Sequence, residues 1–225
     1  MSDPAVHSRR TGTQRGGLPG RQAQAARNDQ RILDSARAVF ISDPAAPITA
    51  VAKHAGVGIS ALYTRYASKE ELLRKLCADG LALVVAETEA TLAKLRDGGD
   101  RWQVFADYMR RLTDADTSSL VLPLAGKFAP TPEMYALADH ARRLNTELFA
   151  HIRDVLRPDV TVDDISLVFE LVAAVKFKGQ ERTKELRHRY LALILDGLRA
   201  TEREALPGSP PVWQDISERW NPDNK

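Results

Sequence analysis

The side chains best suited to polar recognition are concentrated within residues 48–73. Hydroxyl and cationic groups recur there in two short helical patterns, and such groups hydrogen-bond to phosphate oxygens and to the edges of bases. At the start of the first pattern, the Thr49 hydroxyl and the backbone N–H groups can bind an anion. The second pattern ends in Arg65, whose fork of donors suits a guanine edge, and Lys69 follows as a point charge for phosphate. The chemistry predicted here is recognition of a polyanion.

Groups for covalent catalysis or for metal binding are not arranged at useful spacings. The five histidines show no ligand spacing such as H-E-x-x-H, and the chain contains no nucleophile elbow, Walker loop or G-x-G-x-x-G. Asp139 and His140 are neighbours in sequence, but adjacent residues on a helix do not face each other. The one cysteine, Cys77, lies among leucines at helical spacing and is expected to be a packed thiol. We predict that the chain is not an enzyme and has no cofactor or metal.

The elements that must position the polar groups form a helix-turn-helix pattern. One short helix is expected over residues 49–55, with Thr49 as its N-cap, and a second over residues 60–66. Gly56 between them tolerates the positive φ of a tight turn. In such a motif the second helix enters the major groove of DNA. The positions expected in the core of this unit are Ile48, Val51, Ala52, Val57, Leu62 and Tyr66.

Helical patterns on either side complete a small domain. Upstream, apolar residues follow helical spacing from Asp29 until Asp43-Pro44 and Pro47 end the helix. Downstream, Ser68 and Glu71 form a capping box that opens a long helix over 69–95. Together with the motif, these helices resemble the TetR family of bacterial transcriptional regulators over roughly residues 31–73. The resemblance is carried by Ile32-Leu33, Ala36, Phe40, Ala55-Gly56-Val57, Leu62-Tyr63, Tyr66 and Ser68-Lys69-Glu70-Glu71-Leu72.

The sequence departs from the family pattern in and before the second helix of the motif. The link over residues 42–47 is short and Pro-rich, where the family usually has a Gly and an aromatic residue. Ser60-Ala61 stands where many members have Gly-Thr, and Ile59 where a polar residue is common. The family's threonine often touches DNA, whereas Ile59 and Ala61 could contact thymine methyl groups. For Tyr63, a partly buried core position is the alternative. The predicted DNA-contacting residues are Thr49, Ile59, Ser60, Ala61, Tyr63, Thr64, Arg65 and Lys69.

Charge is distributed unevenly along the chain. The net charge is +2, yet residues 1–66 hold nine Arg or Lys against four Asp, so this part carries +5 and the rest −3. Residues 1–27 are rich in Gly, Gln, Arg and Ser, and we expect a disordered basic arm that reaches DNA or is simply solvated. No apolar signal core or membrane-spanning run is present. We expect a soluble, cytoplasmic protein.

The remainder of the chain predicts an all-α fold of about nine helices. Further helical patterns cover residues 102–114, 131–156, 162–177 and 181–206, and no alternating strand pattern occurs. The predicted organisation is a disordered arm (1–27), a three-helix DNA-binding domain (28–75), a larger helical ligand-binding and dimerisation domain (76–206) and a tail (207–225). The tail contains Trp213, Ile216 and Trp220, and we expect it to fold back onto the body.

The family resemblance implies a homodimer and a small-molecule effector. Two helices in the body are apolar on more than one face and could form a four-helix interface with a partner, or pack within one chain. The predicted interface residues are Phe169, Val172, Leu186, Tyr190, Leu193 and Ile194. A pocket with an apolar wall and a few polar anchors is the expected form of an effector site, although most such aromatics are core. The pocket candidates are Trp102, Phe105, Met109, Phe128, Tyr135, Asn145, Phe149 and Glu170.

The sequence therefore predicts a ligand-responsive regulator that binds a palindromic operator in double-stranded DNA as a homodimer. Repression is the predicted direction of regulation. Two alternatives stay open. A regulator without a small-molecule effector would respond to protein contacts or concentration. A helical protein-interaction adaptor would show no salt-sensitive binding to duplex DNA.

Overall fold

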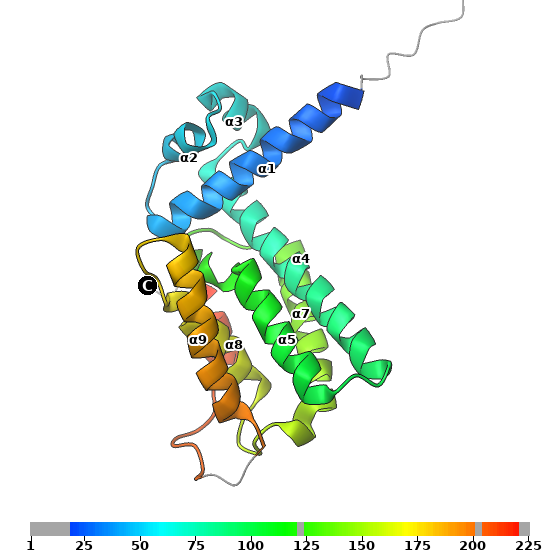
Figure 1. The fold of residues 1–225 in the computed structure, drawn as a ribbon. Helices are drawn as coiled ribbons and strands as arrows, with labels where there is room; N and C mark the ends of the chain where they lie inside the picture. Colours follow the sequence, from blue (N-terminus) through cyan, green and yellow to red (C-terminus); the bar gives the residue numbers. More distant parts are fainter. Residues whose placement is uncertain (1–18, 121–123, 201–203, 221–225) are drawn as a thin grey trace, which may run out of the picture.

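The computed structural model describes residues 19–120, 124–200 and 204–220, and within these ranges the chain is all-helical (Figure 1). These ranges contain nine α-helices and three short 3-10 helices, which confirms the predicted fold class. The elements are α1 Pro19–Ser42, α2 Ile48–Ala55, α3 Ile59–Arg65, α4 Lys69–Arg96, α5 Arg101–Ala115, η1 Thr117–Leu120, α7 Pro132–Ile152, η2 Arg153–Val155, α8 Val162–Ala174, α9 Gln180–Leu198, α10 Trp213–Ser217 and η3 Glu218–Trp220.

The molecule has a small domain at one end and a larger helical body at the other, joined by α4 (Figure 1). Helices α1, α2 and α3 pack together with the first turns of α4, and α4 then runs along α5 and α7. One buried cluster fills the small domain and includes Phe40, Leu62 and Leu72. A second fills the body around Phe105, Met109 and Leu191. Because α4 contributes to both clusters, it is the mechanical link between the two parts.

Helix α1 is longer than the sequence analysis predicted. It begins at Pro19, so residues 19–27 are helical and their assignment to a disordered arm is wrong. Side chains one turn apart support this segment, because Arg27 donates to Gln24 and Gln24 donates to Asn28. Polar composition hid the helix, since a solvent-facing helix shows no apolar stripe. Residues 1–18 of the predicted arm lie outside the described residues.

The helix ends follow most of the predicted local signals. Gly56 lies in the left-handed region at φ 65° and ends α2, as predicted. Ser68 caps α4 by accepting from the backbone N–H of Glu71, whereas the Glu71 carboxylate reaches the N–H of Ala67 instead of that of Ser68. Thr49 is not the N-cap of α2, because the helix begins at Ile48 after Pro47. Thr49 therefore lies in the first turn with its side chain exposed.

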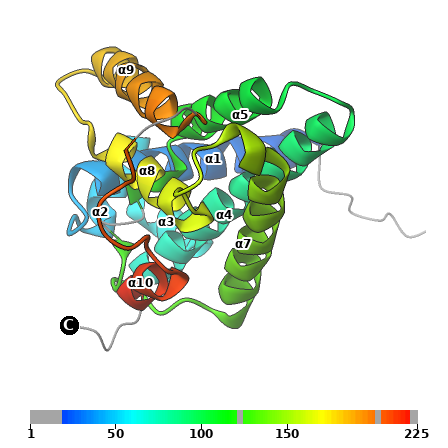
Figure 2. The ribbon, with the colours of Figure 1, turned by 90° about the horizontal axis from the view of Figure 1, so that it is seen from below.

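The carboxy-terminal segment packs against the body, as predicted. Ile216 of α10 is buried, and the rings of Trp220 and Phe128 meet edge to face with centroids 6.1 Å apart. Arg219 forms a bidentate ion pair with Glu170 of α8 at 2.8 and 2.9 Å. Viewed along the bundle, α10 lies beside α7 and α8 (Figure 2). Among the residues described, no helix has the length and apolar character needed to cross a membrane.

Candidate nucleic-acid interface and internal cavity

Most of the predicted contact residues of the helix-turn-helix have exposed side chains. Leu62 and Tyr66 are buried beneath α3 and fix its orientation. The Tyr63 side chain is 47% exposed, so the alternative of a core tyrosine is wrong. The exposed side chains offer hydroxyl, phenol, guanidinium and methyl groups. The predicted contact residues with exposed side chains are Thr49, Ile59, Ser60, Ala61, Tyr63, Thr64 and Arg65.

Arg65 is held by a carboxylate that the sequence analysis did not single out. Its Nε and Nη2 donate to Asp29 of α1 at 2.9 and 3.0 Å, and the Tyr66 hydroxyl donates to the same carboxylate at 2.7 Å. The hydrogen bond from Arg65 lowers the pKa of Asp29, and burial with the same carboxylate raises the pKa of Tyr66. These contacts fix the end of α3 to α1.

The Lys69 ammonium is directed into the link between α1 and α2. Its Nζ donates to the carbonyls of Pro44 and Ala46 at 3.2 and 2.6 Å, and it lies 5.0 Å from the centroid of the Phe40 ring. Burial lowers the pKa of Lys69. Two of its three donors are thus occupied in fixing the Pro-rich link. The predicted phosphate contact competes with this internal role.

The body contains a cavity of about 510 Å³ between α4, α5, α7, α8 and the carboxy-terminal segment. Five of the eight pocket candidates line it, with Tyr135 as the exposed member. The other three do not, and their assignment to the pocket is wrong. Trp102 packs under Arg199, Met109 lies inside the second core cluster, and Phe128 belongs to the first core cluster. The candidates that line the cavity are Phe105, Tyr135, Asn145, Phe149 and Glu170.

The polar groups of the cavity wall are largely engaged with one another. The Tyr108 hydroxyl donates to Asn145 Oδ1 at 2.8 Å and lies 3.1 Å from the Thr88 hydroxyl. Burial raises the pKa of Tyr108 to about 12, so this phenol stays neutral. Burial likewise raises the pKa of the Cys77 thiol to about 12, in agreement with a packed, unreactive cysteine. Asn145 lines the cavity, and its amide nitrogen has no hydrogen bond among the described residues.

The predicted dimer residues divide between an exposed face and the interior. On α9, Tyr190 and Leu193 are 43% and 62% exposed, and Ile194 is half-buried. Phe169 instead lines the cavity and meets Tyr108 edge to face. Val172 and Leu186 are buried within the chain, so these three residues are not available to a partner. On α8 the exposed large residue is Leu171, at 64% exposure.

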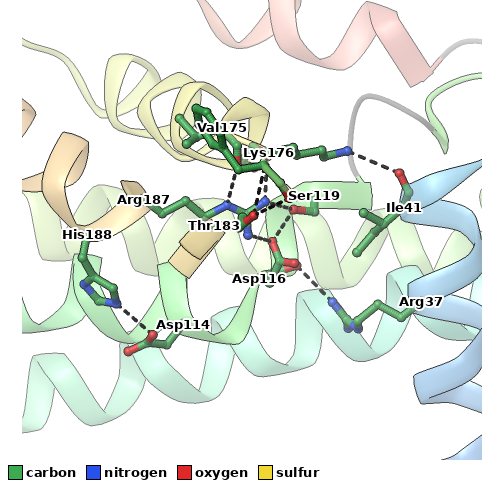
Figure 3. A network of polar contacts seen from close by, with 12 residues as sticks. Arg37, Ile41, Asp114, Asp116, Ser119, Val175, Lys176, Thr183, Arg187 and His188 are labelled. Carbon is green, nitrogen blue, oxygen red and sulfur yellow. Dashed lines mark hydrogen bonds and ion pairs between the residues drawn. The ribbon is translucent and has the colours of Figure 1, made fainter. Parts of the chain in front are cut away.

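A polar network joins the body to the DNA-binding end (Figure 3). Buried Arg187 of α9 donates to Asp116 Oδ1 at 2.8 Å and to the Ser119 hydroxyl at 3.0 Å. Its remaining donors bind the carbonyls at the end of α8, those of Ala173 and Val175. Arg37 of α1 then donates to the Asp116 carbonyl at 3.0 Å. The end of α5, η1, the end of α8 and α9 thus meet at Arg187.

Sequence reasoning missed several residues of these sites. Asp29 had no signal, because its partner lies 36 positions away. Tyr108 lies in a correctly predicted helix on its buried stripe, where a ring that packs and a ring that lines a cavity look alike. Trp213 and Trp220 did carry a signal, since aromatic residues are unusual in a tail, and both line the cavity.

Comparison with known proteins gives a family match over the helix-turn-helix region. The family model described as "Bacterial regulatory proteins, tetR family" matches residues 32–76. A comparison with curated proteins gives no match.

Solved structures share the fold along most of the chain. The ketosteroid transcriptional regulator KstR2 of Mycobacterium tuberculosis is 18% identical, with 78% of this chain and 96% of that chain covered and a TM-score of 0.57. A TetR transcription regulatory protein from Mycobacterium vanbaalenii is 23% identical, with 80% and 99% covered and a TM-score of 0.51. LfrR from Mycobacterium smegmatis, solved with proflavine, is 19% identical, with 75% and 96% covered and a TM-score of 0.50. The match over residues 32–76 shows that the helix-turn-helix is similar to the DNA-binding segment of the tetR family of bacterial regulatory proteins, and the solved structures show that most of the chain shares their fold.

Proposed function

We propose that this regulator is a homodimeric repressor that binds a palindromic operator and is released by a small molecule. The observation that carries the proposal is the connection between its two sites. Helix α4 begins under α3, where Leu72 and Leu73 join the core of the small domain, and it continues along the cavity, where Leu81 and Val84 line the wall. A change at the cavity can therefore move the recognition helix.

The DNA-reading part of the proposal is supported by the exposed face of α3. Ser60 and Thr64 offer hydroxyls to base edges, and Ile59 and Ala61 offer apolar surface to thymine methyl groups. Tyr63 and the first turn of α2 at Thr49 offer donors to phosphates on either side. Arg65 can reach a guanine with the donor that Asp29 leaves free, or by exchanging Asp29 for the base.

The dimer part of the proposal is supported by the apolar face of α8 and α9. Leu171, Tyr190 and Leu193 are exposed there, and large exposed apolar patches mark interaction surfaces. A twofold axis through this face would pair two copies of α8 and α9 in a four-helix interface. Two α3 helices separated by about 34–36 Å would then fit successive turns of the major groove.

The effector part of the proposal is supported by the partly open, mostly apolar cavity, which is of a size typical for small-molecule sites. LfrR, which shares the fold, was solved in complex with proflavine. A ligand that binds more tightly to a form of the dimer in which the two α3 helices no longer match successive turns of the major groove would release the operator.

The test is selection of bound duplexes from a random pool, repeated at two salt concentrations. Enrichment of a palindrome, with binding that weakens as salt rises, is the expected result. The enriched duplex then serves as the probe in a release screen with small molecules. No enrichment, even in the low-salt arm, would contradict sequence reading and favour a protein-interaction adaptor. An operator that no compound releases would favour a regulator without a small-molecule effector.

A further inference from the structure

The cavity wall contains an arginine that forms no ion pair with the residues that the structure describes. Arg142 of α7 lines the cavity, and its Nε is buried without a hydrogen-bond partner. Within the described ranges, no ion pair or hydrogen bond of its guanidinium is present. Its contact is with the Trp213 ring of the carboxy-terminal segment, 5.2 Å from the centroid. Buried polar atoms are normally hydrogen-bonded, so an unpartnered Nε on a side chain that lines a cavity points to a missing acceptor.

Other charged groups at the wall are already engaged. Asp139 accepts from Arg143, and the Glu170 carboxylate is satisfied by both nitrogens of Arg219. Arg37 donates to the Asp116 carbonyl. Asp163 is in the first turn of α8, where the helix dipole stabilises a carboxylate without any ligand. Arg142 is therefore the group at this wall that is best placed to bind an ion.

The shape of the site defines the rest of the ligand. Phe105, Tyr108, Phe149 and Phe169 give the cavity aromatic walls, and the Asn145 amide adds one neutral donor. A guanidinium lying over an indole ring presents its N–H edge for a bidentate contact with two oxygens of an anion. We infer that the effector is an amphipathic organic anion, with an apolar aromatic-sized body in the cavity and a carboxylate or sulfonate on Arg142. This inference rests on the proposed effector site and names its ligand class.

Two dyes that differ by one group test the inference on the full chain. The anionic probe is 1-anilinonaphthalene-8-sulfonate, and the neutral probe is N-phenyl-1-naphthylamine, which has the same rings without the sulfonate. The variants are Arg142→Gln and Arg142→Lys, with Arg110→Gln as the matched control, because Arg110 is exposed on α5 and pairs with Asp107 outside the cavity lining. Ala138→Trp fills the cavity from the same helix and reports whether the dyes bind there.

We expect the anionic dye to bind the unmodified protein more tightly than the neutral dye. Arg142→Gln should weaken the anionic dye by about 10- to 100-fold, as expected for a lost hydrogen bond to a charged group, and leave the neutral dye nearly unchanged. Arg142→Lys should retain part of this preference, and Arg110→Gln should have no effect.

Three results would overturn the inference in different ways. If Arg142→Gln weakens the binding of both dyes equally, Arg142 has a structural role and does not bind the anion. Equal affinity of the unmodified protein for both dyes would remove the preference for an anion while leaving the effector site intact. If neither dye binds, or if Ala138→Trp displaces neither, the cavity is not a ligand site and the effector part of the proposed function fails as well.

Discussion

Arg37 of α1 donates from Nη1 to the backbone carbonyl of Asp116, 3.0 Å away, and so ties the DNA-binding domain to the end of α5. Asp116 holds the left-handed conformation, at φ 53°, which is uncommon for a residue with a side chain. Its carboxylate is fixed in turn by Arg187 of α9. We call these contacts of Arg37, Asp116 and Arg187 the junction. A shift of α5 relative to α9 must therefore break the junction or be transmitted through it to α1 (Figure 3).

The junction should be a major source of stability. Arg187→Met removes four hydrogen bonds and leaves the Asp116 carboxylate without its cation, so we expect the free energy of unfolding to fall by about 3 kcal/mol. Urea unfolding followed by circular dichroism measures the change. Arg182→Met is the control on the same helix, because its pair with Glu185 is exposed and contributes less than about 1 kcal/mol. Equal losses in the two variants would contradict the role of the junction.

The specificity of DNA binding should depend on Arg65. Arg65→Ala is expected to cost about 1–3 kcal/mol of operator binding and to relax the preference at one base position. Affinity measured on the operator and on single-base variants tests this, with Lys53→Ala as a control for an exposed cation at the end of α2. A loss that is equal for all sequences would make Arg65 a phosphate contact.

The contact between α1 and α3 should weaken in acid. The pKa of Asp29 in the folded protein lies below its ordinary value of 3.8, chiefly because of the hydrogen bond from Arg65. A depressed folded pKa gives a stabilisation that is present above the unfolded pKa and is lost as the pH falls through the folded value. Asp29→Asn should thus be less stable than the unmodified protein at pH 6, with a difference that shrinks below about pH 4. A difference that stays constant with pH, measured by urea unfolding, would show that the charge of Asp29 is unimportant.

Lys69 should stabilise the link between α1 and α2. Lys69→Met retains much of the packing on Phe40 but removes the hydrogen bonds to Pro44 and Ala46, and we expect it to lower the free energy of unfolding by about 1–3 kcal/mol. The salt dependence of operator binding reports on its second predicted role. A slope flattened by about one unit would assign it a phosphate contact as well. Unchanged stability would argue against the internal role.

The turn of the helix-turn-helix should tolerate only glycine at position 56. A Cβ there would lie 3.3 Å from Arg31 Nη2, on a backbone with φ 65°. Gly56→Ala is therefore expected to destabilise the protein by about 1–2 kcal/mol. Gly197→Ala in α9, where nothing lies within 4 Å and φ is not positive, should stabilise it by about 0.5–1 kcal/mol. Thermal unfolding compares the two, and the same sign for both would refute the conformational argument.

Local signals predicted the order of helices well. The apolar spacing around Phe40 and Leu62, the glycine turn and the Ser68 cap each act within a few residues, so the sequence displays them directly. The start of α1 was missed because a polar exposed helix has no apolar stripe. The orientation of α8 was missed because a helix that is apolar on several faces does not indicate which face points inward. The sequence pattern consequently predicted Phe169 and Val172 at the interface with a partner, whereas the structure places both inside the chain.

The sequence by itself determined a helix-turn-helix with an exposed polar face, since periodicity, turn and caps are properties of short segments. Only the tertiary structure decided which charges are paired. Asp29 meets Arg65 from 36 positions away, and Glu170 meets Arg219 from 49 positions away. Such pairings depend on how helices cross, which no local pattern encodes. For the same reason the sequence could show that arginines occur on α7, but not that Arg142 Nε would lack a hydrogen-bond partner among the described residues at the wall of a cavity.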